Sequence, residues 1–244
     1  MTGTKTGAIT IGGASGYWGD AALATPQLLA VEGLDYLVYD YLAEVTMSIM
    51  ARARAADPEQ GYAADFVSAA MAPNLQRIAA CGVKVIANAG GVNPRACAEA
   101  LRKLIADQGL DLVVGTVLGD DLLPRVQELA DRSGGGAIRE MFSGEPFPDP
   151  ERVASANAYL GAFPIAECLR RGADIVITGR CVDSAVTLGA CIHAFGWQPQ
   201  DFDRLAQGSL AGHILECGTQ ATGGNYTDWE TVADTLASAG YPLA

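Results

Sequence analysis

The sequence predicts an α/β fold, with an open, mostly parallel, doubly wound sheet and helices on both faces. Apolar, strand-like runs alternate with helical patterns, the order that produces strand–helix–strand crossovers. Half of the residues are hydrophobic and only 18% are charged, as expected when strands are buried on both faces. About five strands are evident, too few for an eight-stranded barrel. We expect residues 1–244 to form a single domain.

The first half of the chain contains three of the expected strands, at residues 7–11, 34–42 and 83–88. Helices are expected at residues 22–32, 46–56 and 62–81. Pro73 should break or kink the last of these, because proline cannot donate the helical hydrogen bond. Asn93 and Pro94 predict the N-cap and first residue of another helix, which ends at Gln108.

The second half contains two more expected strands, at residues 112–118 and 173–180. The expected helices are residues 122–132, 156–171, 182–195 and 205–217. The second of these ranges is expected to be helical only in part, because the run AFPIAE interrupts the helical pattern. Residues 133–151 are rich in glycine and proline and predict an irregular excursion or a lid.

Charge and cysteine content narrow the class of protein. The 16 basic and 28 acidic residues give a net charge of −12, which disfavours nucleic acid and anionic membrane surfaces as partners. The six cysteines contain no C-x-x-C pair, and the N-terminus lacks the apolar region of an export signal. No apolar run approaches the ~18 residues of a membrane span. We therefore expect a cytoplasmic protein with reduced thiols.

Unusual sequence follows each expected strand, in the runs GGASGYWGD, DYLAE, NAGGVNP, GDD and TGRCVDS. Ligands of open α/β sheets bind outside the carboxyl ends of the strands, so these runs predict a small-molecule site. The candidate binding residues are Gly12, Gly13, Ser15, Gly16, Tyr17, Trp18, Asn88, Gly90, Gly91, Asn93, Cys181 and Asp183. The alternative for Asn93 is a purely structural helix cap.

The first glycine run does not match the known nucleotide-binding patterns. Gly13, Gly16 and Gly19 are three residues apart, which is not G-x-G-x-x-G, and no lysine follows as in a P-loop. Asp40 does stand where the ribose-binding acid of a dinucleotide site would lie. A phosphate or carboxylate resting on backbone N–H groups is one interpretation, and a turn whose glycines serve packing is the other.

The candidate catalytic residues are Asp40, Glu44, Asp120 and Arg180. The three carboxylates are suited to acid–base catalysis, and an arginine can pair with a substrate carboxylate. Asp120 and Asp121 are candidates for a divalent cation, with Asp183 or Glu44 as a third ligand. The alternative is that they cap the following helix. No other cofactor is indicated.

Cys181 is expected at a helix N-terminus beside Arg180, where the pKa of a thiol is lowered. The alternative is a buried, inert cysteine. His193 and His213 complete neither a metal site nor a catalytic triad.

The same motifs, together with the helical run after Glu44, GDDLLP and the closing GGNYTDWE, resemble the acyclic terpene utilisation AtuA family over essentially the whole chain. The resemblance implies a role in the breakdown of acyclic terpenoids such as citronellol and geraniol, where acyl-CoA chemistry occurs. It implies no catalytic residues. Members usually continue beyond the point where this chain stops at YPLA, so we expect a missing C-terminal portion.

Three functions stay open from the sequence. The first is an enzyme that acts on a small carboxylate or acyl-CoA thioester by proton transfer, in hydration, dehydration or isomerisation. The second is a non-catalytic binding subunit of a partner enzyme, and the third is a nicotinamide-dependent oxidoreductase. A homo-oligomer, or a second chain carrying the missing portion, is the expected partner.

Overall fold

A computed structural model describes residues 7–134 and 138–244, and it confirms the α/β class. Within these residues, five strands form one all-parallel sheet in the order β1-β2-β3-β5-β4. The strands are β1 (Ile11–Gly13), β2 (Tyr36–Tyr39), β3 (Lys84–Ala87), β4 (Val114–Val117) and β5 (Ile175–Thr178). Each is shorter than or displaced from its predicted range. The first lies further along the chain than residues 7–11, because Gly12 and Gly13 pair with β2.

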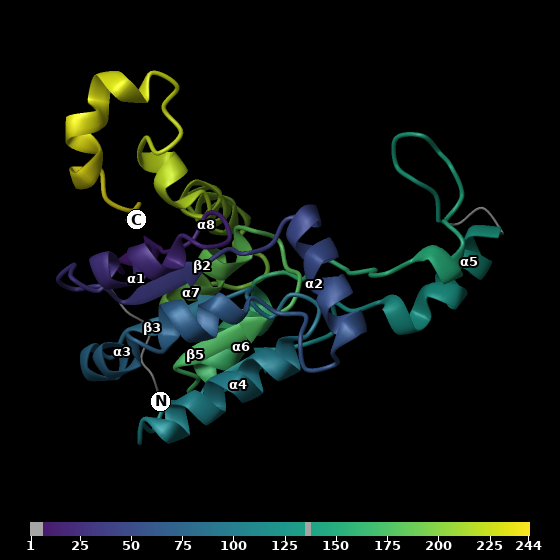
Figure 1. Ribbon diagram of the computed structural model, residues 1–244, viewed down its shortest axis with the longest axis horizontal. Helices are drawn as coiled ribbons and strands as arrows, with labels where there is room; N and C mark the ends of the chain where they lie inside the picture. Colours follow the sequence, from purple (N-terminus) through teal and green to yellow (C-terminus); the bar gives the residue numbers. More distant parts are fainter. Residues whose placement is uncertain (1–6, 135–137) are drawn as a thin grey trace.

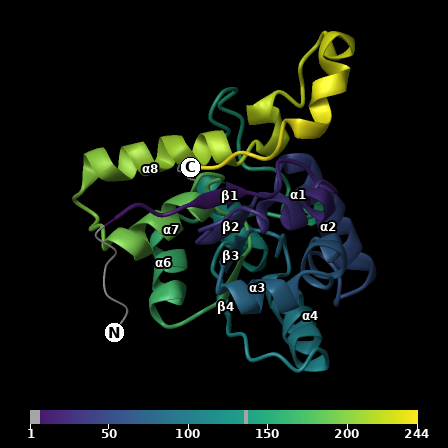
Figure 2. The ribbon, with the colours of Figure 1, turned by 90° about the vertical axis from the view of Figure 1, so that its left-hand side faces the viewer.

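The two faces of the sheet are buried by different helices, which Figure 2 shows on either side of the strands. Alternate strand residues point to opposite faces. Leu37 and Val85 belong to the core on one face, and Val38 and Ile86 to the core on the other. The first face is covered by α1 (Ala21–Leu28), α2 (Glu44–Ala56), η1 (Phe66–Met71), α3 (Leu75–Cys81) and α4 (Pro94–Asp107). The second is covered by α6 (Phe163–Arg170), α7 (Ala185–Phe195) and α8 (Phe202–Leu215).

Prolines set two helix boundaries, one as predicted and one not. The π-helix η1 ends at Met71 and α3 begins at Leu75, so the break expected at Pro73 is confirmed. Residues 156–171 are helical only in part, as expected, since α6 begins only at Phe163. Pro164 lies in the first turn of α6, where its missing N–H costs nothing. The run AFPIAE therefore starts the helix instead of interrupting it.

Two segments project from the sheet and its helices in Figure 1. One contains η2 (Leu123–Arg125), α5 (Val126–Gly134) and η3 (Pro150–Arg152), with a bridge between Arg139 and Pro146. It includes the excursion expected at residues 133–151, of which 135–137 lie outside the described residues. The other contains η4 (Gly218–Thr222) and η5 (Trp229–Ser238), and the chain then returns to β1. There the backbone N–H of Ile11 donates to the carbonyl oxygen of Ala244 at 2.8 Å.

Among the described helices, none combines the length and the apolar character that crossing a bilayer requires.

Candidate functional site

A pocket of about 270 Å³ opens where β1 and β2 end. Its walls come from the glycine loop after β1, the start of α2, and the segment that follows α8. The lining residues are Gly16, Tyr17, Trp18, Asp40, Tyr41, Leu42, Ala43, Thr46, Asp183, Glu216, Cys217 and Gln220. Five of them, namely Gly16, Tyr17, Trp18, Asp40 and Asp183, are residues that the sequence predicts for a site. The pocket therefore lies at the expected edge of the sheet.

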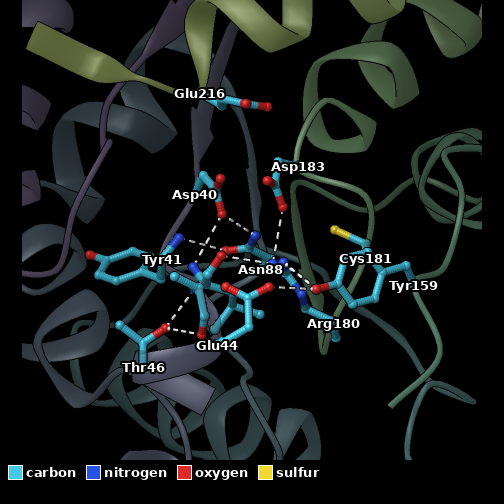
Figure 3. Close-up of polar contacts among 12 residues, drawn as sticks. Asp40, Tyr41, Glu44, Thr46, Asn88, Tyr159, Arg180, Cys181, Asp183 and Glu216 are labelled. Atoms are coloured by element: carbon cyan, nitrogen blue, oxygen red, sulfur yellow. Dashed lines mark hydrogen bonds and ion pairs between the residues drawn. The ribbon is translucent and has the colours of Figure 1, made fainter. Parts of the chain in front are cut away.

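Asp40, the residue after β2, is held in place from beneath by Asn88, the residue after β3. Asn88 is fully buried, and its Nδ2 donates to Oδ1 of Asp40, as Figure 3 shows. The backbone N–H of Leu42 donates to the same oxygen at 3.1 Å. Ser15 Oγ donates to the backbone carbonyl of Asp40 at 2.8 Å. These bonds fix one carboxylate oxygen of Asp40 and leave the other available to the pocket.

Three carboxylates gather at this pocket. Oxygen atoms of Asp40, Asp183 and Glu216 lie within 4.8 Å of one another. Burial raises the pKa of Asp40 to about 6, the Asn88 hydrogen bond opposes this, and the charges of Asp183 and Glu216 raise it further. Burial likewise raises the pKa of Glu216. Oxygen ligands at this spacing could hold a divalent cation, or the group could retain a proton near neutral pH.

Arg180 follows β5 and is buried beside this group. Its guanidinium donates to the carbonyl oxygen of Leu42 at 2.7 Å, to Asp183 Oδ1 at 3.0 Å and to the hydroxyl of Tyr159 at 2.9 Å. Tyr159 in turn donates to Glu44 Oε1 at 3.0 Å, so the exposed Glu44 is linked to the same network (Figure 3). Arg180 thus ties three loops together, and its role as a substrate anchor stays a prediction.

Asp120 and Asp121 are directed to different partners. The buried Asp120 accepts through Oδ2 from the backbone N–H of Arg180 at 2.8 Å and from Asn157 at 3.0 Å. Asp121 pairs with Arg54 at 3.0 Å and accepts from the N–H of Leu123. The cation expected at Asp120 and Asp121 stays a prediction, and the acids that the described residues do bring together are the three at the pocket.

The glycines of the first loop are tightly packed. A Cβ added at Gly12 would lie 2.9 Å from the side chain of Leu28, and one at Gly13 would lie 2.4 Å from the carbonyl oxygen of Leu215. At Gly16 an added Cβ would lie 2.3 Å from the carbonyl oxygen of Cys217. The close approach of these backbones brings the end of α8 onto the loop, and Gly16 alone of the three lines the pocket.

The remaining candidates lie deeper or elsewhere. Gly90 is buried and its N–H donates to the carbonyl oxygen of Thr178, while Gly91 adopts a φ of +53°. Asn93 accepts from Ala96 N–H and so caps α4, and its Nδ2 donates to Pro58 and Gln60 carbonyls.

Cys181 is fully buried, and burial raises the pKa of its thiol to about 12. This shift is opposite to the one expected from its place beside Arg180, because desolvation outweighs the attraction of that cation. His193 bonds Tyr36 and His213 bonds Glu216, at 2.9 Å each.

Sequence reasoning did not select seven of the lining residues, namely Tyr41, Leu42, Ala43, Thr46, Glu216, Cys217 and Gln220. Tyr41, Leu42 and Ala43 belong to the run DYLAE, whose position after a strand was a usable signal. Glu216 and Cys217 follow a helix instead of a strand, and nothing in the local sequence indicates that α8 ends over the first loop.

This arrangement defines an open α/β protein with an acidic pocket at the carboxyl edge of its sheet. Residues 9–244 match the family model described as acyclic terpene utilisation family protein AtuA, so the chain belongs to the AtuA family. Searches of curated proteins and of solved structures gave no match.

Proposed function

We propose that this AtuA-family protein is an enzyme that transfers a proton on a small acyl substrate, with Asp40 as the acid–base group. The observation that supports the proposal is the raised pKa of Asp40 together with its fixed position in the pocket. Asp40 is a pocket carboxyl with a pKa of about 6, fixed through one oxygen. Both protonation states of such a group are populated near neutral pH, which suits proton abstraction and return.

The size and charge of the pocket favour the thioester over the free acid. A volume of about 270 Å³ accommodates a small acyl group, and the nucleotide of a coenzyme would have to lie outside. The three carboxylates repel a substrate carboxylate, and the guanidinium of Arg180 is already bonded to Asp183 and Leu42. A thioester carbonyl is neutral and has an acidic α-carbon, so it fits this environment better.

In the proposed reaction, Asp40 removes the proton from the α-carbon and the electron pair passes to the thioester oxygen. The protonated Asp40 then returns the proton to another carbon in an isomerisation, or to a departing hydroxyl in a dehydration. Asn88 acts as a positioning residue, since it contacts Asp40 from behind the pocket. Tyr17 and Trp18 provide an apolar wall for the acyl chain.

The test uses crotonyl-CoA and 3-hydroxybutyryl-CoA with the corresponding free acids, in buffered D2O, with Mg²⁺ or with a chelator. We expect deuterium incorporation or interconversion of the thioesters, detected by mass spectrometry. Asp40→Asn should lower the rate by about 10²–10⁴-fold. The matched control is Asp111→Asn, because Asp111 is exposed and precedes β4 at the opposite edge of the sheet. A folded Asp40→Asn protein with undiminished turnover, or no exchange on any of these compounds, would refute the proposal.

A non-catalytic binding subunit is the second candidate, and exposed apolar side chains favour it. Met141 and Phe142 are 82% and 88% exposed, and Trp229 is 55% exposed, all on the two projecting segments. Large apolar side chains grouped on projecting segments are typical of contact surfaces. Sedimentation of the purified chain distinguishes the readings, since a monomer that turns over substrate alone excludes an obligate partner.

A further inference from the structure

Three buried oxygen atoms next to the pocket have no hydrogen-bond partner among the described residues: Asp20 Oδ1, Tyr41 Oη and Asp65 Oδ1. Asp20 is 3% exposed and Tyr41 is 2% exposed. Buried polar atoms in native proteins are almost always paired, with protein groups or with a bound species. These three oxygen atoms are therefore expected to contact a bound species that the described residues do not include.

The packing places these atoms in the same region. Asp20 immediately precedes α1 and Asp65 immediately precedes η1, and these two helices pack against each other. The ring of Tyr41 packs edge-on against Phe66, the neighbour of Asp65, with 5.9 Å between ring centroids. The charges of Asp65 and Asp20, after burial itself, raise the pKa of Tyr41.

This region is separate from the three carboxylates of the pocket. Figure 3 shows the ring of Tyr41 directed away from Asp40, Asp183 and Glu216. Tyr41 and Trp18 line the pocket with part of their surface, so they form the wall between it and the buried Asp20 and half-buried Asp65. The side chain of Trp18 also hydrogen-bonds Asp65 from this wall.

Asp20 and Asp65 accept hydrogen bonds from neutral groups. Asp20 Oδ2 accepts from the backbone N–H of Gly16 at 2.9 Å, and Asp65 bonds Trp18, so each acid has only neutral donors. Neither forms an ion pair with a lysine or arginine in the described part of the chain. Burying a carboxylate is costly unless it is paired with an opposite charge.

We propose that Asp20 Oδ1, Asp65 Oδ1 and the phenol oxygen of Tyr41 bind a monovalent cation, Na⁺ or K⁺, behind the pocket wall. Hard cations prefer oxygen ligands, and all three orphaned atoms are oxygens. The cation offsets part of the two carboxylate charges and satisfies the orphaned oxygens. Because Asp20 also holds Gly16, the bound ion stabilises the glycine loop that lines the pocket. The inference does not depend on the proposed activity.

The first test compares thermal unfolding in NaCl, KCl and choline chloride at equal ionic strength. We expect a saturable rise in Tm with Na⁺ or K⁺ and none with choline, since choline is too large for a buried site. Asp20→Asn and Asp65→Asn should lose the rise, while Asp111→Asn should keep it. Equal Tm values of the wild-type protein in all three salts would overturn the proposal in favour of an internal water or a retained proton.

Tyr41→Phe gives a second test, because the proposal predicts the sign of the stability change in each salt. If the phenol oxygen is a ligand, the variant is less stable than the wild type in NaCl or KCl but equal or more stable in choline chloride. Without a cation, deletion of an unpaired buried hydroxyl is neutral or stabilising in every salt, which would contradict the proposal.

Crystals grown with Tl⁺, a heavy substitute for K⁺, locate the ion directly and do not depend on variants that fold. We expect anomalous density between Asp20, Asp65 and Tyr41. Density only at Asp40, Asp183 and Glu216, or none at either place, would overturn the assignment.

Discussion

Asn88 bridges Asp40 and the residue after it: its Nδ2 donates to the Asp40 carboxylate, and its Oδ1 accepts from the backbone N–H of Tyr41 at 2.7 Å. The oxygen and the nitrogen of the Asn88 side-chain amide thereby each have a partner within the protein. A fully buried amide between two strand ends fixes the direction of the Asp40 side chain, so Asn88 acts on a ligand only through Asp40.

The first prediction concerns Asn88→Ala. Loss of the amide donor removes a hydrogen bond that favours the charged form of Asp40, so the pKa of Asp40 should rise above about 6. The N–H of Tyr41 also loses its partner, which should lower the free energy of unfolding by about 1–3 kcal/mol. Carboxyl-carbon NMR titration and urea unfolding measure the two effects. Gln127→Ala, which removes an exposed amide bonded to Asp131 on α5, is the control. An unchanged Asp40 titration would remove the positioning role.

The second prediction concerns pH. Asp40 has a pKa of about 6 in the folded protein against an ordinary value of 3.8, so between these values the folded state binds more protons than the unfolded state. The free energy of unfolding should therefore fall as pH rises from about 4 to about 6, by at most about 3 kcal/mol from this group. Asp40→Asn should remove that fall and be more stable than the wild type at pH 7. Urea unfolding at several pH values measures both. Parallel curves for the two proteins would contradict this account.

The layered fold could be predicted from the sequence because strands buried on both faces of a sheet are mostly apolar, and this pattern is local in the sequence. The mostly apolar run at residues 83–88 predicts a strand buried on both faces. Asn93 predicts the start of a helix because its side chain can accept a hydrogen bond from the first turn. The position of β5 between β3 and β4 could not be read in this way. It depends on how the crossovers carrying α4 and α6 pack, which no local pattern encodes.

Pocket-lining residues were predictable only where a side chain follows a strand. Asp40 and Asp183 could be placed together from the sequence because parallel strands end at one edge, whereas Glu216 lies after α8 and reaches the pocket by a tertiary contact that no sequence signal indicates. For Cys181, the lowered pKa that its charged neighbour suggests is wrong in direction, and the alternative of a buried, inert cysteine agrees with its complete burial. The sequence therefore indicates which charged groups are neighbours along the chain, but it does not indicate how far the fold removes a group from water.

The third prediction concerns thiol reactivity. Cys81 is exposed, whereas Cys97 and Cys181 are buried and their thiols are held protonated by burial. Because the thiolate is the reactive form, iodoacetamide at pH 8 should modify Cys81 in the native protein and reach Cys97 and Cys181 only after unfolding. Mass spectrometry of peptides measures each site. Rapid native labelling of Cys181 would show that it is an activated nucleophile after all.

The fourth prediction uses two glycines that differ in surroundings. An added Cβ at Gly13 would lie 2.4 Å from the carbonyl oxygen of Leu215, whereas Gly161 has nothing within 4 Å of that position and no positive φ. Gly13→Ala must push the end of α8 away, at a cost of about 1–3 kcal/mol in the free energy of unfolding. Gly161→Ala should be nearly silent.

The displacement also reaches the pocket, because Glu216 directly follows Leu215. The charge of Glu216 is one of the causes that raise the pKa of Asp40, so moving it away should lower that pKa in Gly13→Ala. Urea unfolding and carboxyl-carbon NMR titration of both variants measure the two consequences. If Gly13→Ala loses stability while Asp40 titrates as in the wild type, the end of α8 does not control the acidic group. If neither quantity changes, the close packing of Gly13 against Leu215 is itself wrong.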